Sequence, residues 1–313
     1  MAPVTCSIIV PSFNTCELTL SCLRSVQKHP PATPYEIILV DNNSNDETYA
    51  RVRREFPEVQ AVCNASNLGF GKACNIGSRL AKGRYLLFLN SDTESLPDTF
   101  NPLIDWLDTH PHTAIVGPEL LSSQHGLIQM SWAWNPILLG EFIQRPLAPY
   151  LVRHSQLRQA IVRWLQRRAR SVPIICGACF MVRRRAFDEI AGFDEEFELY
   201  FEDSDLCLRC RQKGWSIDYI PHAQIIHHLG QSTKEPWSLT SLVYRQSQIY
   251  YYRKHAFTGA VPILKSYLLL KWFKLWWRVH LIVQDKEAGR AYLSRFRKTI
   301  FERQRFRLAD PKT

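Results

Sequence analysis

Apolar and polar segments alternate regularly through the first 120 residues of the chain. Short apolar runs such as 6–13 (CSIIVPSF) and 35–41 (YEIILVD) predict strands. The segments between them, such as 16–29 (CELTLSCLRSVQKH), have the spacing of amphipathic helices. Strands that alternate with helices predict an α/β fold, in which a mostly parallel sheet has helices on both faces.

Polar side chains follow three of the predicted strands at the point where each strand ends. The apolar run 85–89 (YLLFL), typical of a strand buried on both faces, leads directly into 90–92 (NSD). Two earlier strands end in 12–14 (SFN) and 41–43 (DNN). Ligands of open α/β sheets bind outside the carboxyl ends of the strands. We therefore expect these three segments to meet at one edge of the sheet.

Acidic residues favour a cation at this edge. Asp41 and Asp92 end strands, and Glu202, Asp203 and Asp205 follow downstream. Mg²⁺ or Mn²⁺ typically keeps one or two protein carboxylates and takes its remaining ligands from phosphate and water. The pattern predicts a divalent metal and a diphosphate substrate, although an aspartate at the end of a strand can also cap the following helix.

Two histidines end a later apolar run, 223–230 (AQIIHHLG). A histidine in such a place is commonly a core or surface residue. Close to an acidic cluster, a neutral imidazole is also a good ligand for Mn²⁺. We expect His227, in preference to His228, to contact the metal or a phosphate.

Other cofactor sites are disfavoured. After Gly69 and Gly71, the third glycine of a dinucleotide fingerprint is replaced by Cys74, and the chain has no P-loop motif. The C-x-x-C pairs 176/179 and 207/210 have zinc-ribbon spacing. Their apolar surroundings favour buried free thiols instead.

Charge is distributed unevenly along the 313 residues. Residues 253–313 carry 15 Lys+Arg against 4 Asp+Glu, whereas residues 1–252 have a net charge of −1. We therefore expect a main domain over 1–252 and a separate basic tail over 253–313. The nine cysteines are scattered, and no cationic segment precedes the first strand, so we expect a cytoplasmic protein with reduced thiols.

Six motifs in order over about residues 5–235 resemble those of glycosyltransferase family 2, the inverting enzymes with the GT-A fold. The motifs are SIIVPSFN, ILVDNNSNDET, NLGFGKACNIG, LFLNSDT, GFDEEFELYFEDSDLCLR and HHLGQS. Within the family, the chain most resembles bacterial rhamnosyltransferase-like members that build surface polysaccharides. The resemblance implies a nucleotide-sugar half over 1–118 and an acceptor and catalytic half over 119–252.

The resemblance also implies roles for individual residues. Nucleotide-sugar contacts fall on Pro11, Ser12, Asn14, Asp41, Asn43, Asn67, Gly69, Asn75, Asn90 and Ser91. The range 90–92 stands where the family has its D-x-D motif, and Asp92 is the acid left to hold the metal, with His227. The pair Glu202 and Asp203 matches the family's E-D motif, in which the aspartate is the general base. Glu198 stands where relatives usually have an aromatic residue, and we expect this departure to alter acceptor choice.

The implied reaction is transfer of a sugar to a hydroxyl of a glycan or lipid-linked glycan in cell-surface polysaccharide synthesis. The branch resemblance favours dTDP-L-rhamnose as the donor. Two alternatives stay open: a nucleotidyltransferase acting on sugar phosphates, and a nucleic-acid-binding protein that uses the basic tail. We do not expect nucleic acid as a partner, because the aromatic residues of the tail fall on one apolar stripe.

The tail contains an interrupted apolar stretch, 262–283. At 100° per residue, Lys271, Lys274 and Arg278 share one helical face. The opposite face collects apolar residues: Leu269, Trp272, Trp276, Val279 and Val283. This pattern predicts a helix lying in the plane of an anionic membrane surface, which would hold the enzyme at the inner face of the cell membrane. A helix packed on the main domain is the alternative.

Overall fold

The computed structural model describes residues 3–122, 127–136, 155–228, 239–281 and 286–302. Residues 229–232 of the HHLGQS motif, Val283 and the end of the tail at 303–313 lie outside these ranges. Contacts divide the chain into two compact units. The first unit is Met1–Glu195 with Asp203–Leu229, and the second is Glu196–Glu202 with Gly230–Thr313. The main-domain boundary expected at 252 thus falls inside the second unit.

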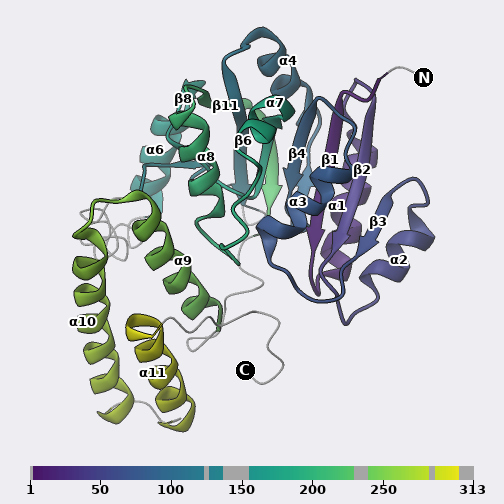
Figure 1. Ribbon diagram of the computed structural model, residues 1–313. Helices are drawn as coiled ribbons and strands as arrows, with labels where there is room; N and C mark the ends of the chain where they lie inside the picture. Colours follow the sequence, from purple (N-terminus) through teal and green to yellow (C-terminus); the bar gives the residue numbers. More distant parts are fainter. Residues whose placement is uncertain (1–2, 123–126, 137–154, 229–238, 282–285, 303–313) are drawn as a thin grey trace. The chain divides into compact units, whose positions relative to one another are not determined.

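The first unit is built on a sheet with nine strands in the described part of the chain (Figure 1). The strand order is β3-β2-β1-β4-β10-β6-β11-β5, and β8 also pairs with β11. The strands are β1 (Cys6–Ser12), β2 (Tyr35–Asp41), β3 (Gln60–Cys63), β4 (Tyr85–Leu89), β5 (Thr93–Ser95), β6 (Thr113–Ser122), β8 (Arg170–Ser171), β10 (Cys179–Arg183) and β11 (Ser216–His227). A second sheet pairs β7 (Trp132–Ala133) with β9 (Ile174–Ile175).

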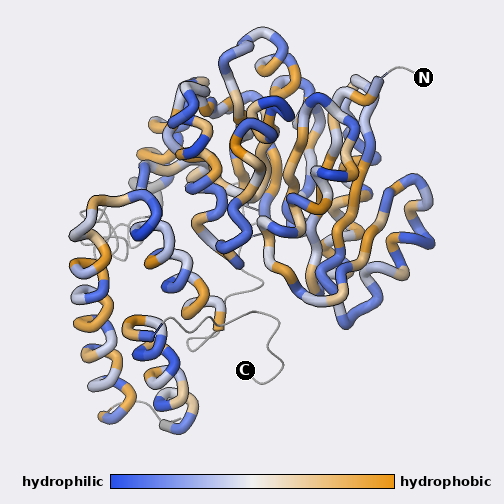
Figure 2. Tube along the Cα trace, viewed as in Figure 1, coloured by the Kyte–Doolittle hydropathy of each residue, from blue (hydrophilic) through white to orange (hydrophobic). Residues whose placement is uncertain are grey.

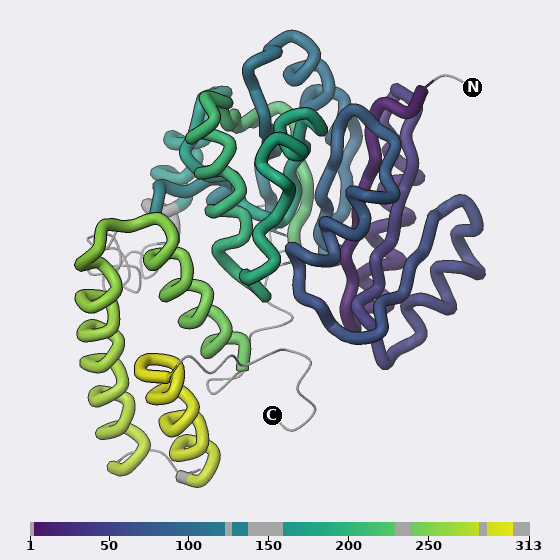
Figure 3. Tube along the Cα trace, in the orientation of Figure 1, coloured from purple at the N-terminus to yellow at the C-terminus, as the bar shows by residue number. Residues whose placement is uncertain are grey.

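Most strands of the large sheet run in one direction. β1, β2, β3 and β4 are mutually parallel, as are β6 and β11. β10 is antiparallel to both β4 and β6, so these two strands are parallel to each other. Figure 3 follows the chain from the purple and blue strands of the first half into the teal and green strands of the second half. The sequence prediction of a mostly parallel sheet is confirmed.

Helices cover both faces of this sheet (Figure 1). The helices of the unit are α1 (Cys16–Lys28), α2 (Thr48–Glu55), α3 (Phe70–Leu80), α4 (Asn101–Thr109), α6 (Ser155–Gln166), α7 (Arg184–Glu189) and α8 (Glu202–Gln212). Side chains of α1, α2 and α4 join one hydrophobic cluster, and those of α3, α7 and α8 join the other.

The strands alternate between these two clusters, as the period of two requires. In β1, Ile8 packs in the first cluster and Ile9 in the second, and in β4 the same holds for Leu87 and Phe88. Figure 2 shows these strands as mainly hydrophobic along their length. Burial of both faces explains why β1 and β4 read as continuous apolar runs in the sequence.

The two C-x-x-C pairs lie in different clusters. Cys176 and Cys179 belong to or pack on the first, whereas Cys207 and Cys210 belong to the second. The sheet therefore separates the pairs. Burial raises the pKa of Cys210 to about 12, so this thiol stays protonated and behaves as a small apolar side chain.

The second unit contains the helices α9 (Leu239–His255), α10 (Ala260–Leu281) and α11 (Lys286–Phe301). α10 packs against both α11 and α9. The tail helix predicted over 262–283 therefore forms as α10. No described helix combines the length and apolar character that crossing a bilayer requires.

The prediction that this apolar face is free to bind a membrane was wrong for two of its residues. Val279 is fully buried, and the Trp272 indole N–H donates to the carbonyl of Leu293 in α11 at 2.8 Å. These two residues pack inside the unit rather than facing outward. Trp276 of the predicted face is 38% exposed, and the other exposed large apolar side chains of α10 lie on other faces: Ile263, Leu270, Phe273, Trp277 and Leu281.

Candidate active site

The loops that follow β1 and β2 are tied to each other by hydrogen bonds. Asn14 accepts at its Oδ1 from the backbone N–H of Asn45 (2.7 Å), and its own N–H donates to Ser44 Oγ (2.9 Å). Asp41, which is 1% exposed, accepts from the N–H of Ser44 (2.9 Å) and from its hydroxyl (2.5 Å). Asn14 and Asn43 have positive φ values of 52° and 62°, which asparagine tolerates better than most residues. Both loops are therefore rigid at the carboxyl edge of the sheet.

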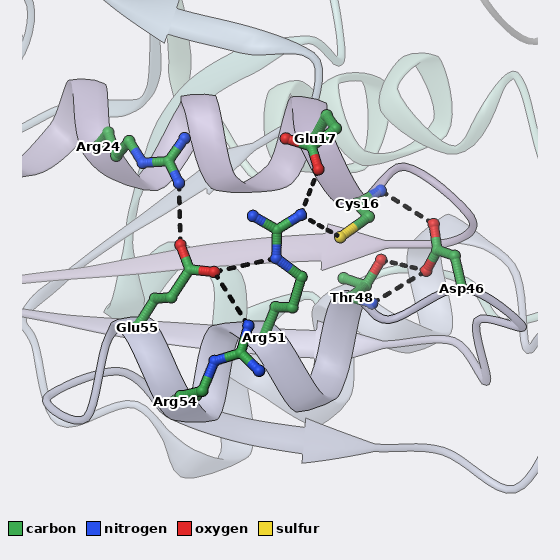
Figure 4. Close-up of polar contacts among 8 residues, drawn as sticks. All are labelled: Cys16, Glu17, Arg24, Asp46, Thr48, Arg51, Arg54 and Glu55. Atoms are coloured by element: carbon green, nitrogen blue, oxygen red, sulfur yellow. Dashed lines mark hydrogen bonds and ion pairs between the residues drawn. The ribbon is translucent and has the colours of Figure 1, made fainter.

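A second set of contacts fixes the same loops to the start of α1 and α2 (Figure 4). Asp46 accepts from the backbone N–H of Cys16 (3.0 Å) and from the N–H of Thr48 (3.1 Å). Arg51 of α2 contacts the carboxylate of Glu17 in α1. None of these residues was predicted to have a role, and their contribution is to hold the two loops.

A chain of hydroxyl groups connects the end of β1 with the end of β4. Ser12 Oγ lies 2.8 Å from Thr19 Oγ1 and 3.1 Å from Thr15 Oγ1. Thr15 Oγ1 lies 2.9 Å from Ser91 Oγ. Pro11 is buried in β1 beside Val40 of β2. The predicted nucleotide-sugar residues Ser12 and Ser91 are therefore brought together through Thr15, which the sequence did not single out.

The loop before α3 is also held at this edge. Asn67 Oδ1 accepts from the N–H of Gly69 at 3.0 Å, and Asn42 Nδ2 donates to the carbonyl of Gly69 at 3.2 Å. Gly69 has φ of 80° and ψ of 175°, a conformation that requires glycine. The predicted residues Asn67 and Gly69 thus shape the N-terminal end of α3.

Asn75 has a different environment from the other predicted nucleotide residues. Its Nδ2 donates to the carbonyl of Phe193 (2.9 Å) and to Glu195 Oε1 (3.1 Å), and its Oδ1 accepts from the N–H of Phe193 (2.9 Å). The residue is 7% exposed. These contacts connect α3 to the turn after α7, so a contribution of Asn75 to donor binding would act through that turn.

Asp92 and His227 face each other at the end of β4. His227 Nε2 lies 3.5 Å from Asp92 Oδ1, with side chains 10% and 22% exposed. The pairing of β5 with β11 causes this approach, because His227 is opposite Thr93, the residue that follows Asp92. Two ligands that each stand about 2.1 Å from one cation are at most about 4.2 Å apart, so these two atoms are close enough to share a metal ion.

Gln129 fixes the tautomer of His227. Its Nε2 donates to the carbonyls of His227 (2.9 Å) and Leu121 (3.3 Å), which identifies Oε1 as the free acceptor of the amide. His227 Nδ1 lies 3.1 Å from this Oε1 and must donate its proton there. The Nε2 atom then keeps a lone pair, which is the form of imidazole that binds metals.

The donor set fits a divalent cation. With the Nδ1 proton on Gln129, both Nε2 of His227 and the Asp92 carboxylate are acceptors that face each other. A cation between them satisfies both atoms. In the described part of the chain, no group of three or more His, Cys, Asp or Glu side chains is arranged to hold a metal. Two protein ligands leave the other positions to diphosphate and water, which is the usual arrangement for Mg²⁺.

His228 and Glu94 form a separate pair beside this site. His228 Nε2 lies 3.0 Å from Glu94 Oε1, and the N–H of His228 donates to the carbonyl of Asp92 at 2.9 Å. The imidazole that faces the Asp92 carboxylate is therefore that of His227, whereas the imidazole of His228 faces Glu94.

The second candidate carboxylate, Asp203, is held by N–H donors. Its Oδ2 accepts from the N–H of Gly177 (3.1 Å), and its Oδ1 accepts from the N–H (2.6 Å) and hydroxyl (3.2 Å) of Ser204. Burial raises the pKa of this carboxyl, and the hydrogen bonds to its charged form oppose the rise. A carboxylate with a raised pKa is a stronger base than an ordinary aspartate.

The neighbouring acids differ from Asp203. Glu202 is buried as the first residue of α8. Asp205 is fully buried and accepts from Arg209 Nε at 2.7 Å. Arg209 in turn donates to the carbonyls of Ile190 and Gly192. Asp205 is therefore part of a structural ion pair.

Backbone contacts place Asp203 near the end of β4. Gly177, which donates to Asp203, precedes Ala178, whose carbonyl accepts from the N–H of Asn90 at 2.9 Å. Asn90 is two residues from Asp92. The carboxyl end of β4 thus carries the Asp92–His227 pair, which suits a cation. It also lies close to the buried Asp203 carboxylate, whose pKa is raised.

The match to known sequences decides the family. The family model described as glycosyl transferase family 2 matches residues 7–191. The chain belongs to this family. A second model, described as glycosyl transferase family group 2, matches residues 141–287. The resemblance stated from the sequence motifs is confirmed, and the protein is a glycosyltransferase.

Several proteins are similar over most of the chain. The N-acetylglucosaminyl-diphospho-decaprenol L-rhamnosyltransferase of Mycobacterium tuberculosis is 27% identical over 76% of this chain and 84% of its own length. The dTDP-rhamnosyl transferase RfbF of Shigella flexneri is 23% identical over 74% of this chain and 73% of its own. Among solved structures, the mannosyltransferase PcManGT of Pyrobaculum calidifontis, in complex with GDP-Man and Mn²⁺, has a TM-score of 0.59 at 17% identity. The match covers 97% of this chain and 90% of the mannosyltransferase chain, which confirms the GT-A-type fold.

Replacement of Asp92 by asparagine should abolish metal-dependent nucleotide binding. The change removes the charged half of the Asp92–His227 pair while leaving its shape. We expect the Mn²⁺-dependent gain in affinity for a nucleoside diphosphate to disappear in titration calorimetry.

Gln129→Ala should weaken Mn²⁺ binding by about 10–100-fold, the usual effect of removing a partner that orients a ligating histidine.

Glu94→Gln is the matched control, because Glu94 is two residues away and contacts His228 instead. Its Mn²⁺-dependent affinity should equal that of the wild type. Unchanged affinity in Asp92→Asn would show that the metal is held elsewhere.

Proposed function

We propose that the protein is an inverting glycosyltransferase that moves L-rhamnose from dTDP-L-rhamnose to a hydroxyl of a lipid-linked glycan. The observation that carries the proposal is the arrangement at the end of β4. The facing pair Asp92 and His227 suits a cation that neutralises a diphosphate. The contact with Gly177 brings the buried Asp203 carboxylate, whose pKa is raised, near the same end of β4.

The residues divide the reaction between them. Asp203 takes the proton of the acceptor hydroxyl as the oxygen of that hydroxyl forms a bond to the anomeric carbon. The bond from this carbon to the diphosphate oxygen breaks on the opposite face, and the nucleoside diphosphate leaves with the electron pair. Asp92 and His227 would hold a divalent cation, which when bound supplies positive charge to the leaving diphosphate. The rigid loops after β1 and β2 bind and orient the nucleoside.

The choice of donor and acceptor is supported by the relatives. Both the mycobacterial enzyme and RfbF carry rhamnosyl transfer in their names, and the mycobacterial acceptor is a lipid diphosphate. Each alignment covers more than two thirds of this chain and more than two thirds of the relative. A lipid-linked acceptor would also give a role to the exposed apolar side chains of α10.

A panel of nucleotide sugars tests the function. We expect dTDP-L-rhamnose with Mn²⁺ to protect the full-length protein against heat more than UDP-glucose, UDP-galactose, UDP-N-acetylglucosamine or GDP-mannose do. Turnover should release nucleoside diphosphate. Release of pyrophosphate from a nucleoside triphosphate and a sugar phosphate would instead identify a nucleotidyltransferase, and preferential protection by another nucleotide sugar would replace the donor.

Replacement of Asp203 by asparagine should separate catalysis from donor binding. The rate of transfer should fall by about 10²–10⁴-fold, because that is the usual contribution of a general base. Donor affinity should stay within about twofold of the wild type, because Asp203 does not belong to the Asp92–His227 pair that would hold the cation.

The pH dependence follows from the raised pKa of Asp203. The base works only when ionised, so kcat/KM should fall as the pH drops through this pKa. The midpoint of this acidic limb should lie above about 3.9, the ordinary pKa of aspartate, and the limb should be absent in Asp203→Asn.

A loss of donor affinity in Asp203→Asn as large as the loss in Asp92→Asn would make Asp203 a diphosphate or metal residue.

We further propose that α10 binds the inner face of the cell membrane. At 100° per residue, Leu270, Phe273, Trp277 and Leu281 fall within about 80° of the helix surface. We call these residues the apolar arc. All four are at least 49% exposed, and the exposed Lys274 and Arg278 lie directly beside them. Aromatic and aliphatic side chains next to basic ones suit an anionic lipid surface.

Binding to anionic vesicles should have two parts. The basic residues contribute about 1 kcal/mol each, which salt screens. The apolar arc contributes burial, which salt does not weaken. Phe273→Ser with Trp277→Ser should therefore remove the binding that persists at high salt, and Lys274→Ser with Arg278→Ser should remove the salt-sensitive part.

Trp164→Ser is the matched control, because Trp164 of α6 is as exposed as Trp277 (61% against 58%) and lies outside the second unit. It should leave vesicle binding unchanged. Salt-dependent binding to DNA, without preference for anionic vesicles, would overturn the membrane proposal and favour nucleic acid.

A further inference from the structure

The residues directly before Asp203 make their contacts in the second unit. Glu196–Glu202 cluster with residues 230–313, although the chain returns to the first unit at Asp203. The chain thus leaves the sheet unit for one short segment and re-enters it at the candidate base. We call Glu196–Glu202 the approach segment.

Aromatic rings of α9 hold the approach segment. Phe197 is fully buried, and its ring meets that of Tyr250 edge-on, with 4.8 Å between centroids. Phe201 packs between Tyr244 and Tyr251, with centroids 5.2 and 5.4 Å away. Aromatic pairs at such distances stabilise beyond the area that they bury.

Further contacts come from the same face of α9. Ser247, which is 5% exposed, donates from its hydroxyl to the carbonyl of Leu199 at 2.8 Å. Tyr244 also contacts the ring of Tyr200, with centroids 5.3 Å apart. Tyr244, Ser247 and Tyr251 recur at intervals of three and four residues, so they line one side of the helix. We call Tyr244, Ser247, Tyr250 and Tyr251 the α9 clamp.

The backbone of the approach segment has an unusual conformation where the clamp holds it. Tyr200 and Phe201 are consecutive residues with φ of 69° and 68°. Bulky side chains rarely adopt this left-handed region, and such residues persist only when the surrounding structure determines them. The clamp rings on Tyr200 and Phe201 and the hydrogen bond to Leu199 supply that determination. The chain then enters α8, whose second residue is Asp203.

We propose that the α9 clamp positions the general base. The clamp fixes the turn at Tyr200 and Phe201, and this turn sets the first residues of α8 and with them the Asp203 carboxylate. The proposal rests on the proposed function, in which Asp203 is the base. It makes the clamp residues positioning residues, and it gives α9 a role in turnover that is distinct from membrane binding by α10.

Tyr244→Ala in the full-length protein tests the clamp. Tyr244 is half-buried and touches both left-handed residues. We expect kcat to fall by about 10–100-fold, because a displacement of about 1 Å at a reacting group costs about 10²-fold. KM and binding affinity for the nucleotide-sugar donor should stay within about twofold. Tyr244→Phe keeps the ring and should restore kcat.

Phe296→Ala is the matched control. Phe296 is a buried ring of α11 in the same unit, where it packs on Tyr292. This variant removes a ring from α11 and leaves every clamp side chain in place, so kcat should stay within about twofold of the wild type. An equal fall of kcat in Phe296→Ala, or an unchanged kcat in Tyr244→Ala, would overturn the proposal.

Hydrogen exchange separates this proposal from the proposed function. Amides of residues 196–205 should exchange faster in Tyr244→Ala than in the wild type, and Phe296→Ala should leave them unchanged. Unchanged exchange in Tyr244→Ala would overturn the clamp whatever the activity. If the wild type transfers no sugar while Tyr244→Ala still speeds exchange at 196–205, the glycosyl-transfer proposal fails and the holding of the approach segment by α9 stands.

Discussion

The direction of β10 determines which residues meet at the site. Because β10 runs antiparallel to β4, its first residue, Cys179, pairs with Leu89, the last residue of β4. The chain that enters β10 therefore passes the carboxyl end of β4, where Ala178 accepts from Asn90 and Gly177 donates to Asp203. A parallel strand in the same position would place its beginning at the opposite edge of the sheet. Asp203 and the Asp92–His227 pair would then lie on different edges.

Two carboxylates can serve one reaction only if their surroundings keep their chemistry apart. Asp92 faces an imidazole nitrogen with a lone pair, and a cation between these two acceptors would satisfy both. Asp203 is buried, and this burial favours its protonated form. A carboxylate that ligates a cation loses proton affinity, whereas a buried carboxylate gains it. In the proposed reaction, this difference would suit Asp203 to accept a proton and Asp92 to contact a cation.

Much of this arrangement was predictable, because it depends on local patterns. The apolar run of β4 and the polar residues after it predicted the edge of the sheet, and the motif order predicted the family and its GT-A fold. Gln129 was not predictable, because its contact with His227 depends on the bridge between Leu121 and Ile128 that turns the chain back. For Asn75, the family resemblance implied a ligand contact, and the sequence did not reveal that its amide is hydrogen-bonded to the backbone of Phe193.

Helical periodicity has a related limit in α10. The period correctly grouped Trp272 with Val279, but a sequence does not tell which apolar face a neighbouring helix covers. α11 covers this one, and the apolar arc is left exposed about 150° away.

The second unit combines an exposed apolar arc on α10 with the α9 clamp, and neither a simple membrane anchor nor a simple scaffold would need both. A scaffold has no reason to expose a contiguous apolar arc that includes Leu270 and Trp277, because soluble proteins rarely leave large apolar patches in water. An anchor has no reason to hold Tyr200 and Phe201 in a left-handed turn. The two features also differ in their forces. The clamp is made of ring packing and one buried hydrogen bond, which salt leaves unchanged, whereas Lys274 and Arg278 beside the apolar arc act through charge, which salt screens. If α10 binds an anionic surface as proposed, a rise in ionic strength should weaken that attachment while leaving the turn at Tyr200 and Phe201 in place.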